Sequence, residues 1–187
     1  MARHTARKQA QLKIYVCYDQ VLDQHDRDRL EALFAEKHEV AIVRPVDYEE
    51  FPVSLKTDEV RQKIREDHLR DSVVTVVLVG ASTWKRKLVD WEIGASVRHT
   101  QMNPRSGLLG ILLPSYIAAN KGRHDPHTMP PRLDDNVGCK FARVYEWSDE
   151  VAEVKSWIDQ AFQDRSNVTP TNARLAYPSD RNGKGWS

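Results

Sequence analysis

The apolar run Val73-Val74-Thr75-Val76-Val77-Leu78-Val79 decides the fold class of this chain. A second run of the same kind, Gly107-Leu108-Leu109-Gly110-Ile111-Leu112-Leu113, follows after one predicted helix. Neither run alternates apolar with polar residues. Continuous apolar runs of this length are typical of parallel strands that are covered on both faces by helices. We therefore predict two central strands of an α/β sheet.

Further strands and helices alternate on both sides of these two runs. Because crossovers between parallel strands are right-handed, this alternation predicts a flavodoxin-like, doubly wound three-layer α/β sandwich. Its five-stranded parallel sheet should have the order 2-1-3-4-5. Two segments, residues 44–56 and 114–138, are predicted to be irregular or loop. The other strands are expected at residues 12–18, 40–43 and 141–145, and helices at about 23–37, 57–71, 90–100 and 149–163.

Length and composition indicate one ordinary soluble domain. The chain has 187 residues and a formal net charge of +1. Binding of nucleic acid is not expected, because it needs clustered Lys and Arg side chains. We expect a basic N-terminal arm over residues 1–11, the domain over residues 12–165, and a polar tail over residues 166–187. The tail is predicted to be disordered or to pack on a neighbouring molecule.

Cysteine spacing and hydropathy favour a cytoplasmic protein. Cys17 and Cys139 lack the CxxC spacing of a zinc site, and they provide no disulfide framework. The sequence shows neither a signal-type apolar region nor an apolar run of about 18 residues, so we expect no export and no membrane span. His124 and His127 lie in a Pro-rich segment without further ligands, and no metal is expected.

Polar residues gather where the predicted strands end. In an open α/β sheet, ligands bind outside the carboxyl ends of the strands, at the point where the strand order reverses. The predicted order places Tyr18 and Asp19 beside residues 80–85, and Glu92 follows on the next helix. We therefore predict that Tyr18 and the Ser82 loop form opposite walls of one pocket that contains Glu92.

Other functions of such folds find no support in the sequence. The chain has no GxGxxG and no GxxxxGK[ST] motif, so neither a dinucleotide redox site nor a P-loop is predicted. A phosphoacceptor receiver module has the same fold but needs an Asp at the end of the third strand. Val79-Gly80 stand there instead, and this excludes the receiver function.

Three short motifs resemble the TIR-like (Toll/interleukin-1 receptor-like) domains, above all the TIR-like subunit of the Thoeris antiphage defence system. They are Val16-Cys17-Tyr18-Asp19, Val77-Leu78-Val79-Gly80-Ala81-Ser82-Thr83 and Val89-Asp90-Trp91-Glu92-Ile93, within a resemblance that spans residues 12–163. The resemblance implies NAD+ as substrate without a separate cofactor, and Glu92 as the catalytic residue. It also implies a cyclic ADP-ribose isomer as product, a messenger that activates a separate effector protein. Whether the chain forms a homo-oligomer stays open.

The resemblance also implies which residues contact the substrate. Cys17 stands where the family usually has serine, and Leu88 stands where many members have tryptophan. Trp84 or Trp91 can supply the aromatic wall of the nicotinamide pocket instead. The expected substrate-binding residues are Cys17, Tyr18, Asp19, Asp47, Ser82, Thr83, Trp84, Lys85, Leu88 and Trp91. For Tyr18 and Asp19 a structural role is an equal alternative, Tyr18 as an edge of the core and Asp19 as a helix cap. For the Ser82 to Lys85 loop the alternative is a solvated polar turn, and the resemblance favours binding there.

A single carboxylate suits the chemistry that the resemblance implies for Glu92. Cleavage of the nicotinamide–ribose bond resembles glycoside cleavage and passes through an oxocarbenium-like ribose. Nicotinamide leaves as a neutral molecule and needs no proton, so an anion near a helix N-terminus can stabilise the developing cation. Two alternatives stay open, a surface acid that complements the helix dipole and a non-catalytic TIR-like interaction or assembly module. Residues 44–56 are the expected lid that favours cyclisation over hydrolysis.

Overall fold

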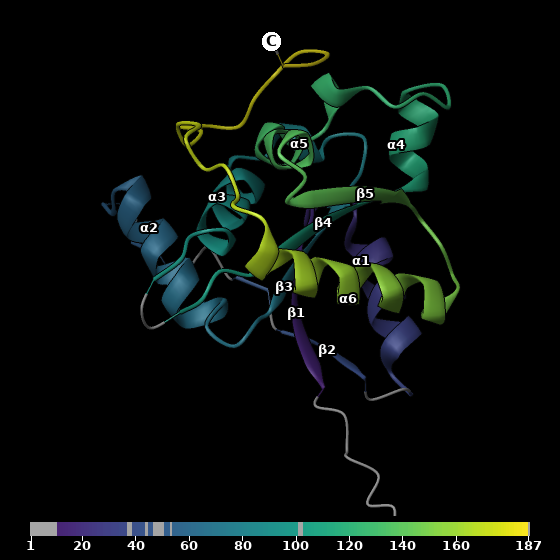
Figure 1. Cartoon of the computed structure of the whole chain (residues 1–187). Coiled ribbons are helices and arrows are strands. Elements are labelled where there is room, and N and C mark those ends of the chain that lie inside the picture. Colours follow the sequence, from purple (N-terminus) through teal and green to yellow (C-terminus); the bar gives the residue numbers. More distant parts are fainter. Residues whose placement is uncertain are drawn as a thin grey trace, which may run out of the picture.

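In the part of the chain that the structure describes, five parallel strands form one sheet in the order β2-β1-β3-β4-β5 (Figure 1). The predicted fold class and strand order are therefore confirmed. The strands are β1 (Leu12–Cys17), β2 (Val40–Ile42), β3 (Val74–Val79), β4 (Gly107–Leu112) and β5 (Ala142–Glu146). The structure is a computed structural model that describes residues 11–36, 39–43, 45–46, 51–52, 54–100 and 103–186.

Helices cover both faces of the sheet and complete three layers (Figure 1). Helices α1 and α6 pack on one face, whereas α2, α3 and α5 pack on the other. No described helix combines the length and the apolar character that crossing a bilayer requires. The helices are α1 (Gln24–Phe34), α2 (Thr57–Lys63), the π-helix η2 (Ile64–His68), the 3-10 turn η3 (Thr83–Lys85), α3 (Lys87–Ser96), α4 (Pro114–Ala119), the 3-10 turn η4 (Pro126–Thr128), α5 (Pro131–Gly138) and α6 (Val151–Asn167).

The register of the central strands explains the continuous apolar runs. Ile14 of β1 lies opposite Val74 of β3, and Val74 lies opposite Gly107 of β4. Every residue of β3 and of β4 is buried, because each strand has neighbours on both sides and helices on both faces. Gly107 also has a local reason to be glycine. A Cβ atom there would collide with the backbone carbonyl of Ala161 in α6, so the missing side chain lets this helix approach the sheet.

Residues 114–138 correct the sequence-based prediction of a loop. The segment contains α4, η4 and α5, and each of them begins with a proline. Proline is favoured at the first position of a helix, where its missing N–H leaves no hydrogen bond unmade. Pro114 and Pro131 therefore begin helices in a segment whose composition is otherwise typical of a loop.

The C-terminal tail, residues 168–186, folds back on its own domain. The prediction of disorder, or of packing on a neighbouring molecule, was wrong for this described part of the chain. Trp91 Nε1 donates to the Tyr177 carbonyl at 2.8 Å, and the Tyr177 N–H donates to Asp90 at 3.2 Å. Farther along, Trp186 Nε1 donates to the Met129 carbonyl at 2.7 Å. In Figure 1 this yellow segment passes α3 and reaches the region of α5.

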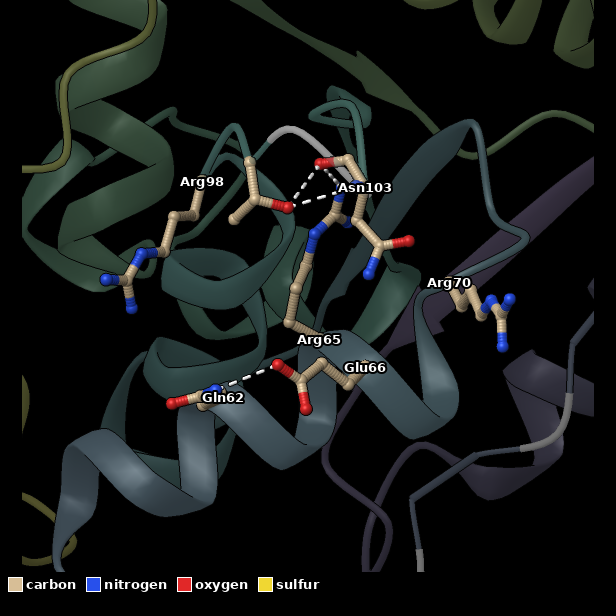
Figure 2. A pocket seen from close by; sticks show the side chains of 7 residues that line it. Gln62, Arg65, Glu66, Arg70, Arg98 and Asn103 are labelled. Carbon is tan, nitrogen blue, oxygen red and sulfur yellow. Dashed lines mark hydrogen bonds between the residues drawn. The ribbon is translucent and has the colours of Figure 1, made fainter.

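Two surface cavities flank the sheet at opposite ends of its strands. The smaller one has a volume of about 220 Å³ and lies where β1 ends, beside the first turns of α3. The larger one has a volume of about 460 Å³ and lies between η2 and the segment that leads from α3 into β4 (Figure 2). The carboxyl ends of the strands are the usual place for a ligand in such folds, so the smaller cavity is the first candidate site.

Candidate functional site

The smaller cavity joins the end of β1, the beginning of α3 and the C-terminal tail. Tyr18 and Asp19 directly follow β1, Leu88 and Glu92 lie on α3, and Asp180 comes from the tail. Of these five residues, only Asp180 was missing from the predicted site. The remaining lining residues are Gln20, Val21, Arg86 and Val89.

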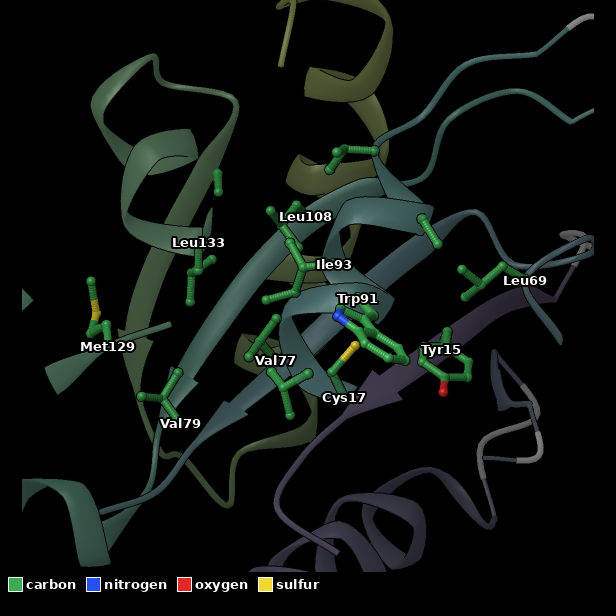
Figure 3. Packing of buried hydrophobic residues seen from close by; sticks show 14 of the residues in the cluster. Tyr15, Cys17, Leu69, Val77, Val79, Trp91, Ile93, Leu108, Met129 and Leu133 are labelled. Carbon is green, nitrogen blue, oxygen red and sulfur yellow. The ribbon is translucent and has the colours of Figure 1, made fainter. Parts of the chain in front are cut away.

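Glu92 is buried, with 4 % of its surface exposed. The Tyr15 hydroxyl donates a hydrogen bond of 2.6 Å to Glu92 Oε1. Burial, then the charge of Glu92 and a hydrogen bond to it, raise the pKa of the Cys17 thiol well above its usual value. Tyr15 and Cys17 lie on the same face of β1, next to Trp91 of α3 (Figure 3). The burial of Glu92 excludes the alternative of a surface acid.

The position of Glu92 within its helix differs from the prediction. Helix α3 begins at Lys87, not at Asp90, so Glu92 lies in the second turn. At this first residue the Lys87 N–H donates a hydrogen bond of 2.9 Å to the Asp180 carboxylate. The field of a helix dipole is felt mainly in its first turn. Asp180 and the first-turn residue Asp90, rather than Glu92, are therefore the acids that complement the N-terminus of α3.

Arg86 links two carboxylates across the cavity. Its Nε donates to Asp19 Oδ2 at 2.7 Å, and its Nη1 donates to Asp180 Oδ2 at 3.2 Å. The hydrogen bond to Asp19 raises the pKa of Arg86. Asp19 also accepts a hydrogen bond from the Val21 N–H at 3.1 Å, so it shapes the turn after β1 as well. With Glu92, the lining contains three acids and one base, and this excess of negative charge favours a cationic group.

The Ser82 loop does not form the predicted opposite wall, because Ser82 is absent from the cavity lining. Helix α3 and the tail residue Asp180 take that place. Thr83 is fully buried, where its hydroxyl accepts from the Gly80 N–H at 2.7 Å and donates to Asp23 at 3.1 Å. Its side chain therefore organises the loop after β3 and does not face a ligand. Lys85 likewise lies outside the lining.

The predicted aromatic wall of tryptophan is also outside the cavity. Trp84 is buried with 2 % exposure, and the Trp91 indole N–H is bonded to the tail. Cys17 lies beneath Glu92 and does not line the cavity either. Tyr18 is the aromatic side chain in the lining, where its hydroxyl donates to Gln24 at 2.8 Å. Asp47 lies outside the described residues.

Two charged residues of the lining, Arg86 and Asp180, escaped the sequence analysis for different reasons. Arg86 belongs to the run Lys85-Arg86-Lys87, which reads as a solvated charged turn, and its link to Asp19 depends on the sheet order. Asp180 lies 94 positions from its partner Arg86, so no local pattern could relate them.

The described side chains contain no group of three or more His, Cys, Asp or Glu residues that could hold a metal ion. His127 packs instead against the end of the tail, with its Nδ1 atom 2.7 Å from the Trp186 carbonyl oxygen and its ring 5.1 Å from the Trp186 ring. Its role is therefore to hold the tail.

Comparison with known families gives one match. The family model described as Thoeris protein ThsB, TIR-like domain, matches residues 15–116, which is more than half of the chain. The matched segment contains Tyr15, Tyr18 and Glu92 and ends in α4, whereas Asp180 lies beyond it. No curated protein matches the chain. With its parallel sheet in the order 2-1-3-4-5, the chain belongs to the family of TIR-like domains of the Thoeris protein ThsB.

Proposed function

We propose that this chain cleaves the nicotinamide–ribose bond of NAD+ in the cytoplasm, with Glu92 as the catalytic residue. We further propose that it forms a cyclic ADP-ribose isomer, a messenger that activates a separate effector protein in antiphage defence. The observation that carries the proposal is the buried Glu92 carboxylate in the wall of a cavity rich in acids. Membership of the TIR-like Thoeris family supports it.

The charge and size of the cavity favour the nicotinamide end of NAD+. The nicotinamide ring of NAD+ is cationic, and the lining acids Asp19, Glu92 and Asp180 outnumber Arg86. A volume of about 220 Å³ is smaller than the roughly 300–1,000 Å³ of pockets that enclose drug-sized ligands. The cavity therefore suits the nicotinamide riboside part, and the pyrophosphate and adenosine would extend outside it.

The proposed reaction needs one anion and no proton donor. The bond between the anomeric carbon and the nicotinamide nitrogen breaks, and its electron pair stays on the nitrogen, so nicotinamide leaves neutral. Positive charge develops on the ribose, where Glu92 stabilises it. Tyr15 holds Glu92 Oε1 in place before the reaction, which reduces the reorganisation that charge stabilisation requires. The raised pKa of Cys17 keeps this residue a thiol, which is a poor competing nucleophile.

Cyclisation requires that a group of the same nucleotide captures the ribose cation before water does. An adenine nitrogen or a ribose hydroxyl has this advantage when it is held close and water is excluded. The proposed lid, residues 44–56, lies partly outside the described residues. The cyclic product therefore rests on the resemblance to the family.

The proposal is tested by incubating the purified chain with NAD+ and separating the products by chromatography with mass detection. We expect nicotinamide and an equal amount of an ADP-ribose product that has lost one water relative to linear ADP-ribose. Linear ADP-ribose alone would contradict the cyclase activity and leave the cleavage activity standing. Intact NAD+ would favour the alternative of a non-catalytic interaction or assembly module.

A further inference from the structure

The larger cavity is lined mainly by charged and amide side chains. It lies on the side of the sheet where β3 and β4 begin, away from the strand ends that carry the Glu92 cavity. Its volume of about 460 Å³ falls within the range of small-molecule sites. The lining residues are Gln62, Arg65, Glu66, Arg70, Arg98, Thr100 and Asn103.

The charge of this lining is strongly positive. Arg65, Arg70 and Arg98 face one acid, Glu66, and that acid already accepts a hydrogen bond of 2.8 Å from Gln62. Within the described ranges, none of the three arginines forms a salt bridge. Three guanidinium groups without a carboxylate partner in one cavity leave positive charge that an anion can neutralise.

Arg65 is the buried member of this set, with 3 % of its surface exposed. Its Nη2 donates to the backbone carbonyls of Asn103 and Pro104. Its Nε and Nη1 are buried and have no hydrogen-bond partner among the residues that the structure describes. Burial alone lowers the pKa of Arg65 to about 10. A buried cation without an acid is costly, and unpaired buried donors are rare in native proteins.

The other lining residues surround Arg65 in a way that suits a ligand with several acceptor atoms. Figure 2 shows Arg98 and Arg70 on opposite sides of Arg65, with the Asn103 amide between Arg65 and Arg70. Thr100 Oγ1 accepts a hydrogen bond from the Asn103 N–H at 3.0 Å and so helps to hold Asn103 in place. Arg98 and Arg70 are exposed, so their side chains are free to close on a bound anion.

We propose that this cavity binds a small phosphorylated anion, with Arg65 at its base and Arg70 and Arg98 as clamps on either side. Guanidinium groups bind phosphate oxygens in bidentate pairs, and three of them favour a ligand with more than one phosphate oxygen in reach. The volume accommodates a free polyphosphate or a mononucleotide. The site is separate from the Glu92 cavity and does not depend on NAD+ cleavage.

Calorimetric titration of the whole chain tests this site, with inorganic pyrophosphate and AMP as separate probes. We expect pyrophosphate to bind the parent. Arg70→Gln and Arg98→Gln should each weaken its binding by about tenfold, because each removes a charge-assisted contact. AMP that binds more tightly than pyrophosphate would identify a nucleotide as the ligand, and the reverse order a free polyphosphate. Arg65 is not substituted, because it also donates hydrogen bonds to the backbone carbonyls of Asn103 and Pro104, and its loss would disturb the fold.

Two matched controls separate this site from others. Arg123→Gln removes another exposed arginine, elsewhere on the surface, and Glu92→Gln changes the proposed catalytic cavity. Both variants should bind pyrophosphate like the parent. The proposal is overturned if neither probe binds the parent, or if Arg70→Gln and Arg98→Gln bind pyrophosphate as tightly as Arg123→Gln does. Binding that is altered only in Glu92→Gln would also overturn it.

Discussion

At the scale of single residues, the structure separates side chains that face a ligand from those that hold the site. Glu92, Tyr18 and Asp19 line the cavity, whereas Tyr15 acts on Glu92 from the strand beneath. Thr83 also holds the site and does not face a ligand, because its hydroxyl accepts a hydrogen bond from Gly80 and donates one to Asp23. A sequence motif alone therefore does not tell which of its residues contact a ligand and which hold other residues in place. Their hydrogen bonds and burial are needed to distinguish the two.

The buried Asp23, which accepts the Thr83 hydrogen bond, should make the stability of the fold depend on pH. Burial raises its pKa from 3.8 to about 6, although the hydrogen bond from Thr83 lowers it. Well below pH 4 the group is protonated in both states, and above about pH 6 the folded state must hold a buried carboxylate. Its contribution to stability is therefore lost as the pH rises between these values, by about 2 kcal/mol.

Asp23→Asn should remove this pH dependence while keeping an oxygen acceptor for Thr83. The pH dependence is measured by urea unfolding of the parent and the variant at about pH 4 and about pH 7. The unfolding free energy of the variant, relative to the parent, should rise by about 2 kcal/mol from the lower to the higher pH. A difference that is the same at both pH values would show that Asp23 titrates normally.

At the scale of elements, the C-terminal tail caps the beginning of α3 and links this helix to α5. Asp180 supplies the cap of α3, and Arg132 of α5 pairs with Asp90 of α3 through Nε at 2.9 Å and Nη2 at 3.2 Å. Arg132 also donates to Asn172 and to the Arg174 carbonyl in the tail. One buried guanidinium thus joins α3, α5 and the tail.

Breaking this ion pair should be costly. The side chains of Arg132 and Asp90 are 1 % and 2 % exposed, so Asp90→Asn leaves a buried cation without its acid. We expect a loss of about 3–5 kcal/mol in the free energy of unfolding, measured by urea denaturation.

The ion pair of Lys155 and Asp159 on α6 is the control, because the Asp159 side chain is 42 % exposed and its partner stays in reach of solvent. Asp159→Asn should cost less than about 1 kcal/mol. Equal losses in Asp90→Asn and Asp159→Asn would contradict the structural role of the buried pair.

At the scale of the whole molecule, the sequence was most informative about the sheet and least about contacts between distant segments. Continuous apolar runs reveal central parallel strands because burial on both faces removes the polar alternation. The order of the strands then places Tyr18 near Glu92 without further information. The tail is different: its polar side chains are used in long-range hydrogen bonds such as those of Asp180 and Asn172. Composition cannot distinguish such a segment from a disordered one.

Hydrogen exchange distinguishes these two states of the tail in the intact chain. The amides of Tyr177, Arg181 and Trp186 donate to Asp90, to the Lys85 carbonyl and to the His127 carbonyl. We expect them to exchange at least about tenfold more slowly than in an unstructured peptide, as read by mass spectrometry or NMR. Exchange of all three at the unstructured rate would mean that the tail does not remain packed on α3 and α5.

The central claim is that Glu92 stabilises the ribose cation of NAD+, and Glu92→Gln tests it most directly. The amide keeps the volume but removes the charge, so the rate of nicotinamide release should fall by about a hundredfold or more, equivalent to about 3 kcal/mol. Glu153→Gln, an exposed exchange on α6, is the control and should match the parent. Melting temperatures of all three proteins show whether the fold is kept. Release of nicotinamide by a folded Glu92→Gln at the parental rate would contradict the claim.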